Sequence, residues 1–166
     1  MGLGRTRHIY NYSQQKEILE LQRRELRCNV IVNGIPESQT SLGDTQQVSE
    51  IFQSLSVTSN ILRSERLGKP KTGQHRLLKV YLNSVEQRNE VLSGSKKLKD
   101  IDKFKHIFIN PDLCANDRKE KARLRKVMMQ TRADNPGKRV YIKKNVLYLE
   151  DKVVDKCDVI GALLRH

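Results

Sequence analysis

The chain has 166 residues, of which 32 are Lys or Arg and 19 are Asp or Glu, giving a formal net charge of +13 and a pI near 9.9. That length accommodates one ordinary domain or two small ones, and it excludes a large enzyme with separate lid and cofactor domains. The charge favours a polyanionic partner, with nucleic acid ahead of an anionic membrane surface.

Targeting signals and metal-binding patterns are not visible in the sequence. It has no run of the roughly 20 apolar residues that span a bilayer, and its first residues lack the apolar core of a signal peptide. We therefore expect an intracellular protein. Cys28, Cys114 and Cys157 lie far apart without CxxC spacing, so we expect no metal site, no disulfide framework and no cofactor.

Residues 1–27 are expected to form an N-terminal helix. From Tyr12 to Arg27 the sequence has no Gly or Pro, and Tyr12, Leu19 and Leu26 recur at seven-residue spacing. Two such repeats fit either a coiled-coil remnant that forms a homo-oligomer or a single solvated helix. The sequence leaves both alternatives open.

Residues 28–111 predict a β-α-β-β-α-β domain. Residues 28–34 are β-branched and end at Gly34, which indicates a buried strand. Asp44 is placed to cap a helix with one apolar stripe, formed by Val48, Ile51, Phe52 and Leu55. Strands are then expected over 61–67 and 77–82, on either side of a basic loop.

The remainder of this domain follows the same order. Ser84 and Gln87 form a capping-box pattern at the start of a helix that ends near Gly94. Residues 96–105 are expected to be a mixed-charge connector, and 106–110 a fourth strand. This is the ferredoxin-like, split-βαβ order, in which a four-stranded antiparallel sheet carries both helices on one face.

Residues 112–166 predict a small α+β C-terminal domain. A basic helix over 117–129 precedes a β-hairpin at 140–142 and 146–149. The tail from Asp155 to His166 has the spacing of a short amphipathic helix, with Val159, Ile160, Leu163 and Leu164 on one side.

The candidate nucleic-acid-binding residues form four groups. If Val80 and Leu82 face the helices, Lys79 and Tyr81 point to the open face, where Tyr81 either stacks on a base or closes the core edge. Cations on the second strand and its loop, on the basic helix and in the hairpin, together with Tyr141, complete the set; for the loop and the basic helix the alternative is a solvated surface. They are Arg63, Arg66, Lys69, Lys71 and Arg76, then Arg118, Lys121, Arg125 and Arg132, then Lys138, Arg139, Tyr141, Lys143 and Lys144. Tyr148 is expected in the core.

A resemblance to a known family covers about Arg24 to Val154. It rests on the Arg/Lys-rich helix and on these fragments in this order: Asn29-Val30-Ile31-Val32-Asn33-Gly34-Ile35-Pro36-Glu37, Arg66-Leu67-Gly68-Lys69, Leu78-Lys79-Val80-Tyr81-Leu82 and Ile109-Asn110-Pro111-Asp112-Leu113. With them the chain resembles the RNA-binding half of LINE-type (non-LTR) retrotransposon first-open-reading-frame proteins. In that family a coiled coil trimerises the protein, and an RNA recognition motif and a C-terminal domain grip single-stranded RNA.

The resemblance implies an RNA-binding protein of a transposable element that forms ribonucleoprotein and acts as a nucleic-acid chaperone, without catalysis. Ile31 occupies the first-strand position where such motifs usually stack a base, so phosphate-gripping cations are expected to dominate. Single-stranded DNA remains an alternative ligand. The scattered histidines and carboxylates form no catalytic constellation. The competing hypothesis is a protein-interaction or assembly module whose basic surface is not a specific nucleic-acid site.

Overall fold

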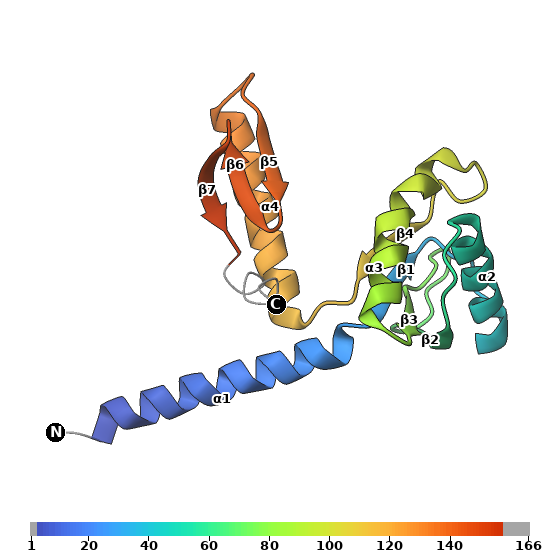
Figure 1. Ribbon diagram of the computed structural model, residues 1–166, viewed down its shortest axis with the longest axis horizontal. Helices are drawn as coiled ribbons and strands as arrows, with labels where there is room; N and C mark the ends of the chain where they lie inside the picture. Colours follow the sequence, from blue (N-terminus) through green and yellow to red (C-terminus); the bar gives the residue numbers. More distant parts are fainter. Residues whose placement is uncertain (1–2, 158–166) are drawn as a thin grey trace. The chain divides into compact units, whose positions relative to one another are not determined.

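The computed structural model describes the backbone of residues 3–157 and the side chains of residues 13–157 (Figure 1). It is an α+β structure with antiparallel sheets and four α-helices in the described part. The chain divides into two compact units, Met1–Asp112 and Leu113–His166. None of the helices within residues 3–157 is both long and apolar enough to cross a membrane.

Helix α1 spans Leu3–Leu26, so the expected N-terminal helix is present and begins earlier than Tyr12 (Figure 1). It contains neither proline nor an internal break. Ile18 and Leu21 are exposed on it. At its end, the Asn29 side-chain amide donates a hydrogen bond to the carbonyl of Glu25, which fixes the passage from helix to first strand.

Four strands form the sheet of the first unit: β1 Asn29–Asn33, β2 Ile61–Arg66, β3 Leu78–Leu82 and β4 Phe108–Pro111. Their order is β2-β3-β1-β4 and every neighbouring pair is antiparallel. All four strands agree with the expected positions. β1 and β3 lie in the middle of the sheet because their alternate positions are almost wholly apolar and β-branched or leucine.

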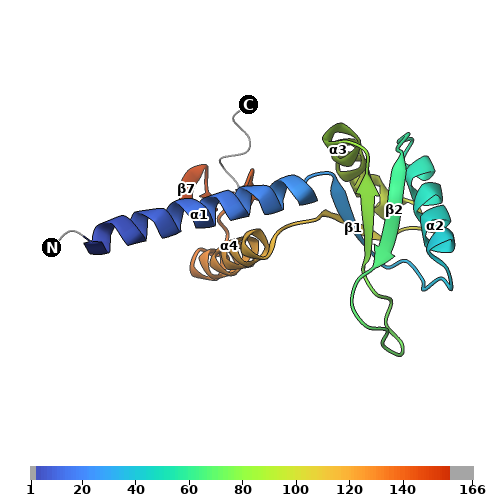
Figure 2. The same cartoon turned by 90° about the horizontal axis from the view of Figure 1, so that it is seen from below.

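Two helices cover one face of this sheet, α2 Ser41–Ser54 and α3 Val85–Gly94; Figure 2 shows α2 alongside β2. The apolar stripe of α2 and Val91 of α3 pack on the inward residues of the strands, and this makes the core of the unit. The core contains Val30, Val32, Ile35, Val48, Ile51, Phe52, Leu55, Leu78, Val80, Leu82, Val91, Leu98, Ile107 and Ile109.

The sequence predicts the N-terminal capping residue correctly for α3 and wrongly for α2. Ser84 caps α3, since its hydroxyl accepts from the backbone N–H of Gln87, as expected. Asp44, however, does not cap α2. Thr40 does, because its hydroxyl accepts from the N–H of Gly43 at 3.1 Å, while Asp44 lies buried in the first turn.

The expected connector after α3 is in part a 3-10 helix, η1 Ser95–Asp100. It forms because Leu98 is buried in the core and anchors the segment despite the surrounding lysines. Mixed charge therefore did not indicate an irregular loop here.

The second unit contains α4 Ala115–Asp134 and three strands, β5 Val140–Lys143, β6 Val146–Leu149 and β7 Lys152–Lys156. The strands form an antiparallel sheet in the order β5-β6-β7. The expected hairpin is present, but β7 was not expected. Asp155 and Lys156 belong to β7 rather than to a terminal helix, Cys157 follows the strand outside any helix, and residues 158–166 of the expected tail helix lie outside the described residues.

One face of this second sheet packs on α4. Its core consists of Leu124, Val140, Leu147 and Cys157, with Val127, Met128, Ile142 and Leu149 packed against them. Both connections between strands are tight turns with positive φ at their two central residues, Lys144–Asn145 and Glu150–Asp151. Such turns match the twist of antiparallel strands, which explains why so short a sequence forms three strands.

Candidate nucleic-acid interface

The open face of the four-stranded sheet follows from the register of its strands. Arg63 pairs with Tyr81 and Tyr81 with Asn29 in one row, while Lys79 and Ile31 lie beside each other in the next. These residues alternate with the buried core residues, so their side chains lie on the face opposite to α2 and α3. The expected placement of Lys79 and Tyr81 is thus observed.

Tyr81 is held by three neighbours on this face. Its hydroxyl donates to Glu65 at 2.5 Å, and the guanidinium of Arg63 lies 4.0 Å from the ring centre. The Lys79 ammonium is 4.9 Å from the same centre. The ring is therefore already in contact with cations, and a base that stacks here must share it with Arg63.

Lys79 is engaged within the fold. Its ammonium lies 3.0 Å from a carboxylate oxygen of Asp112, which also accepts from the Asn29 amide. Burial alone would lower the pKa of Lys79, but the hydrogen bonds with Asp112 and Tyr81 outweigh it and raise that pKa. Lys79 is charged, yet its charge is largely neutralised by Asp112.

Sequence reasoning missed an apolar row at the end of this face. Phe108 pairs with Asn33 and is 60% exposed. Leu67 and Leu77, the latter 42% exposed, lie just beyond the paired residues Arg66 and Leu78, and alternation places them on the same face as Phe108. The Leu67 N–H donates to the Leu77 carbonyl, which aligns the two side chains. The signal was available, because Ile107 and Ile109 alternate with Phe108 and only one of these two sets can be buried.

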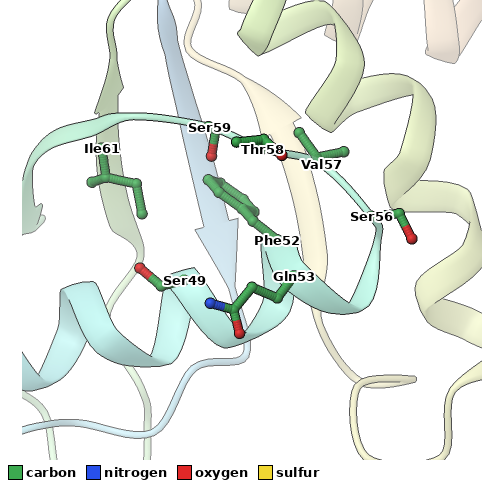
Figure 3. A pocket seen from close by; sticks show the side chains of 8 residues that line it. All are labelled: Ser49, Phe52, Gln53, Ser56, Val57, Thr58, Ser59 and Ile61. Carbon is green, nitrogen blue, oxygen red and sulfur yellow. The ribbon is translucent and has the colours of Figure 1, made fainter.

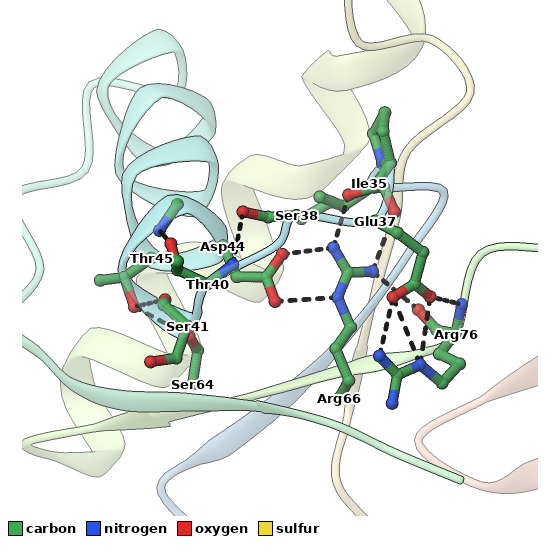
Figure 4. Close-up of polar contacts among 12 residues, drawn as sticks. Ile35, Glu37, Ser38, Thr40, Ser41, Asp44, Thr45, Ser64, Arg66 and Arg76 are labelled. Carbon is green, nitrogen blue, oxygen red and sulfur yellow. Dashed lines mark hydrogen bonds and ion pairs between the residues drawn. The ribbon is translucent and has the colours of Figure 1, made fainter. Parts of the chain in front are cut away.

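Arg66 does not belong to an accessible cation cluster (Figure 4). Its side chain is only 5% exposed, and its guanidinium binds both carboxylate oxygens of Asp44, at 2.5 and 3.0 Å. The remaining donors reach the carbonyls of Ile35, Pro36 and Arg76. The structure therefore uses Arg66 to hold the segment after β1 against β2, and a phosphate at this guanidinium would have to displace Asp44.

Arg76 is paired as well (Figure 4). Its guanidinium lies 2.8 Å from Glu37, and its backbone N–H donates to the same carboxylate. These hydrogen bonds, the side-chain one first, lower the pKa of Glu37 to about 2. The neighbouring Lys69 and Lys71 are exposed.

Hollows on the described part of the first unit lie beside both ends of β2. One of about 510 Å³ is lined by the basic loop between β2 and β3, including Leu67, Leu77, Lys69, Lys71 and His75. Another, of about 550 Å³, lies between the end of α2 and the start of β2 (Figure 3). Its lining consists of hydroxyl, amide and apolar side chains without any charge, so it contributes nothing to binding a polyanion.

The solvent-facing side of α4 carries four cations that have no partner within residues 13–157. Arg118, Lys119, Arg125 and Lys126 are exposed and form no ion pair or hydrogen bond through their side chains with other described residues. We call these four the α4 cations. Their position follows from the helical period, because Leu124, Val127 and Met128 on the opposite side pack on the sheet.

Other basic residues of α4 have roles within the unit. Lys121 is half-buried. Arg132 donates to the Val140 carbonyl and so ties the end of α4 to β5. Arg123 bridges Asp155 of β7, at 2.6 Å, and Glu120, and these hydrogen bonds raise the pKa of Arg123 and lower that of Asp155.

The outer face of the second sheet carries two tyrosines. Tyr141 and Tyr148 are cross-strand partners whose rings stack with centres 5.2 Å apart. The expected burial of Tyr148 is wrong, because Leu147 and Leu149 take the inward positions of β6. Tyr141 also donates to Asp151, which raises the pKa of its hydroxyl. Lys138, Arg139, Lys143 and Lys144 are exposed around this strand pair.

Metal chemistry receives no support from the geometry. Within residues 13–157 no group of three or more His, Cys, Asp or Glu side chains is placed to hold a metal ion. Cys114 and Cys157 are buried free thiols and Cys28 is a half-buried one.

In comparisons with known proteins, no family model and no curated sequence matches the chain.

Proposed function

We propose that this protein binds single-stranded nucleic acid, with RNA as the first choice, and that it is a LINE-type retrotransposon RNA-binding protein. In this role it would coat RNA as a ribonucleoprotein, in the cytoplasm or the nucleus, and act as a nucleic-acid chaperone without catalysis. The observation that carries the proposal is the row of α4 cations, which have no partner among the residues that the structure describes.

Ion pairing decides which basic residues are available to a phosphate. Arg66, Arg76 and Arg123 already hold carboxylates, and a phosphate would have to displace them. The α4 cations require no such displacement, because they lack a carboxylate partner in the part of the chain that the structure describes. The guanidinium group of arginine is also planar and can donate two parallel hydrogen bonds to two oxygens of one phosphate.

The order of the first unit supports the same proposal. A β-α-β-β-α-β chain with the sheet order β2-β3-β1-β4 fits a ferredoxin-like, RNA recognition motif-like domain, followed by a small C-terminal α+β domain. Its open face presents Tyr81 beside Arg63, which suits one stacked base and neighbouring phosphates.

A second candidate function is protein interaction or assembly. It is favoured by the exposed apolar row of Leu67, Leu77 and Phe108, since three large apolar side chains together on one face are typical of a contact surface. Under this alternative the basic surface would not be a specific site.

The two candidate functions predict different effects on RNA binding when the α4 cations are removed. We expect Arg118→Gln combined with Arg125→Gln to weaken binding of a labelled single-stranded RNA about tenfold or more, by fluorescence anisotropy near physiological salt. The matched control is Lys103→Gln with Lys105→Gln, which removes the same charge from exposed residues already paired with Glu50 and Asp102. Equal losses in both variants, or no binding by the unmodified protein, would reject the proposed site.

A further inference from the structure

The outer face of the β5-β6-β7 sheet bears an apolar row that crosses all three strands. Tyr141 pairs with Tyr148, and Tyr148 pairs with Val153 of β7. The opposite face is occupied by the core residues that pack on α4. Val153 is 61% exposed although it lies in a strand, so this row is not part of the core of the unit.

The two tyrosine rings are held in a defined position. They lie 5.2 Å apart with planes inclined by 14°, and the guanidinium of Arg139 lies 4.7 Å from the Tyr141 ring centre. The Tyr141 hydroxyl donates to Asp151 at 2.6 Å. A ligand ring that joins this stack therefore costs little additional side-chain ordering.

The charges around the row are unevenly distributed. Lys143 and Lys144 lie at the β5–β6 turn and are exposed, whereas Glu150 and Asp151 lie at the β6–β7 turn beside Arg139. At the lysine end an anionic backbone meets two adjacent cations, whereas at the other end Glu150 and Asp151 offset most of the positive charge of Lys138, Arg139 and Lys152. A flat apolar ring attached to a phosphate backbone complements this combination, whereas a purely apolar protein surface would leave the lysines unused.

We propose that Tyr141, Tyr148 and Val153 form a stacking platform for unpaired bases, with the backbone on the side of Lys143 and Lys144. The inference rests on the proposed function and deepens it, because it assigns the choice of single strand over duplex to this face. Bases within a duplex stack on each other and offer no free ring face. The α4 cations, in contrast, attract phosphates of either form.

The test compares one RNA as a single strand and annealed to its complement, using the full chain. We expect Tyr148→Leu to weaken single-strand binding about tenfold, with duplex affinity and salt dependence unchanged. Tyr148→Phe, which keeps the ring, should bind as the unmodified protein does. Equal affinity of Tyr148→Leu and the unmodified protein for the single strand would overturn the platform.

A second measurement does not depend on how well Tyr148→Leu folds. The chain has five tyrosines and no tryptophan, so its intrinsic emission comes from tyrosine. Stacking should quench this emission in the unmodified protein on addition of polyuridylate, and the quenching should diminish in Tyr148→Phe and in Tyr141→Phe. Tight, salt-sensitive binding without quenching would reject the platform and leave the proposed function standing, whereas absence of binding to either RNA form would reject both.

Discussion

Lysine and arginine side chains in this protein fall into two groups, those that the fold pairs internally and those that it leaves to solvent. The sequence alone does not distinguish the two groups of cations, because both lie in basic segments. Arg66 illustrates the difference: it directly follows Glu65 in β2, so alternation places it on the face opposite to Arg63 and Glu65, where it binds Asp44 of α2. Burial and partners, rather than residue type, decide which cations are available.

The buried Arg66–Asp44 ion pair leads to a prediction about the free energy of unfolding. Arg66→Met should lower the free energy of unfolding by about 3 kcal/mol, because it leaves a buried carboxylate without a partner. Replacing both residues, with Asp44→Leu and Arg66→Met together, should recover much of that loss. Urea unfolding followed by circular dichroism measures both.

The control for this pair is Arg63→Met on the same strand. Arg63 is exposed and contacts only the Tyr81 ring among described side chains, so its loss should cost less than about 1 kcal/mol. A comparable cost at both positions would contradict the assignment of Arg66 to the fold.

The Glu37–Arg76 pair predicts a pH dependence. Its hydrogen bonds lower the pKa of Glu37 from 4.5 to about 2, so the folded state holds the ionised carboxylate more strongly than the unfolded chain does. The stabilisation is therefore complete above about pH 5 and disappears as the pH falls from 4.5 towards 2. The difference in unfolding free energy between the unmodified protein and Glu37→Gln should shrink across this range; a constant difference would refute the pairing.

At the scale of elements, periodicity predicted most of the first unit. The β-branched run of β1, the stripe of α2 and the Ser84 cap of α3 each carry a local signal, and all three are observed. What failed depended on tertiary contact. Asp44 has the chemistry of a cap but is drawn to Arg66, and η1 is fixed by the burial of Leu98 within a charged segment.

The same limit applies to the second unit and to the candidate site. β7 contains Lys152, Asp155 and Lys156, and it forms because the Glu150–Asp151 turn returns the chain to β6. The strand that contains Tyr148 is apolar on both faces, so alternation alone does not show which of its faces is buried. Phe108, in contrast, could have been found from its neighbours Ile107 and Ile109.

The β6–β7 turn gives a prediction at this scale. Glu150 has φ 47°, a left-handed conformation that Asn adopts more readily than other side chains. Glu150→Asn should therefore raise the free energy of unfolding by about 0.5 kcal/mol. The control, Glu150→Gln, removes the charge without relieving the backbone and should give no gain; an equal gain in both would show that charge, and not the turn, is responsible.

At the scale of the whole molecule, positive charge is concentrated in the second unit. Leu113 to Cys157 contains thirteen Lys and Arg against six Asp and Glu, which is a net +7 of the total +13. Most of the Lys and Arg residues of that unit lie on α4 and in or next to β5. This distribution suits a protein that binds backbone phosphates with the second unit while the open face of the first adds a contact through Tyr81.

The salt dependence of RNA affinity tests the central claim most directly. Anisotropy titrations of single-stranded RNA over a series of salt concentrations should give a steep linear fall of log affinity with log salt. In Arg118→Gln with Arg125→Gln the slope should become shallower by about 1.4, because each lost phosphate contact on a single strand removes about 0.7. A flat dependence in the unmodified protein, or an unchanged slope in the variant, would contradict phosphate binding by the α4 cations.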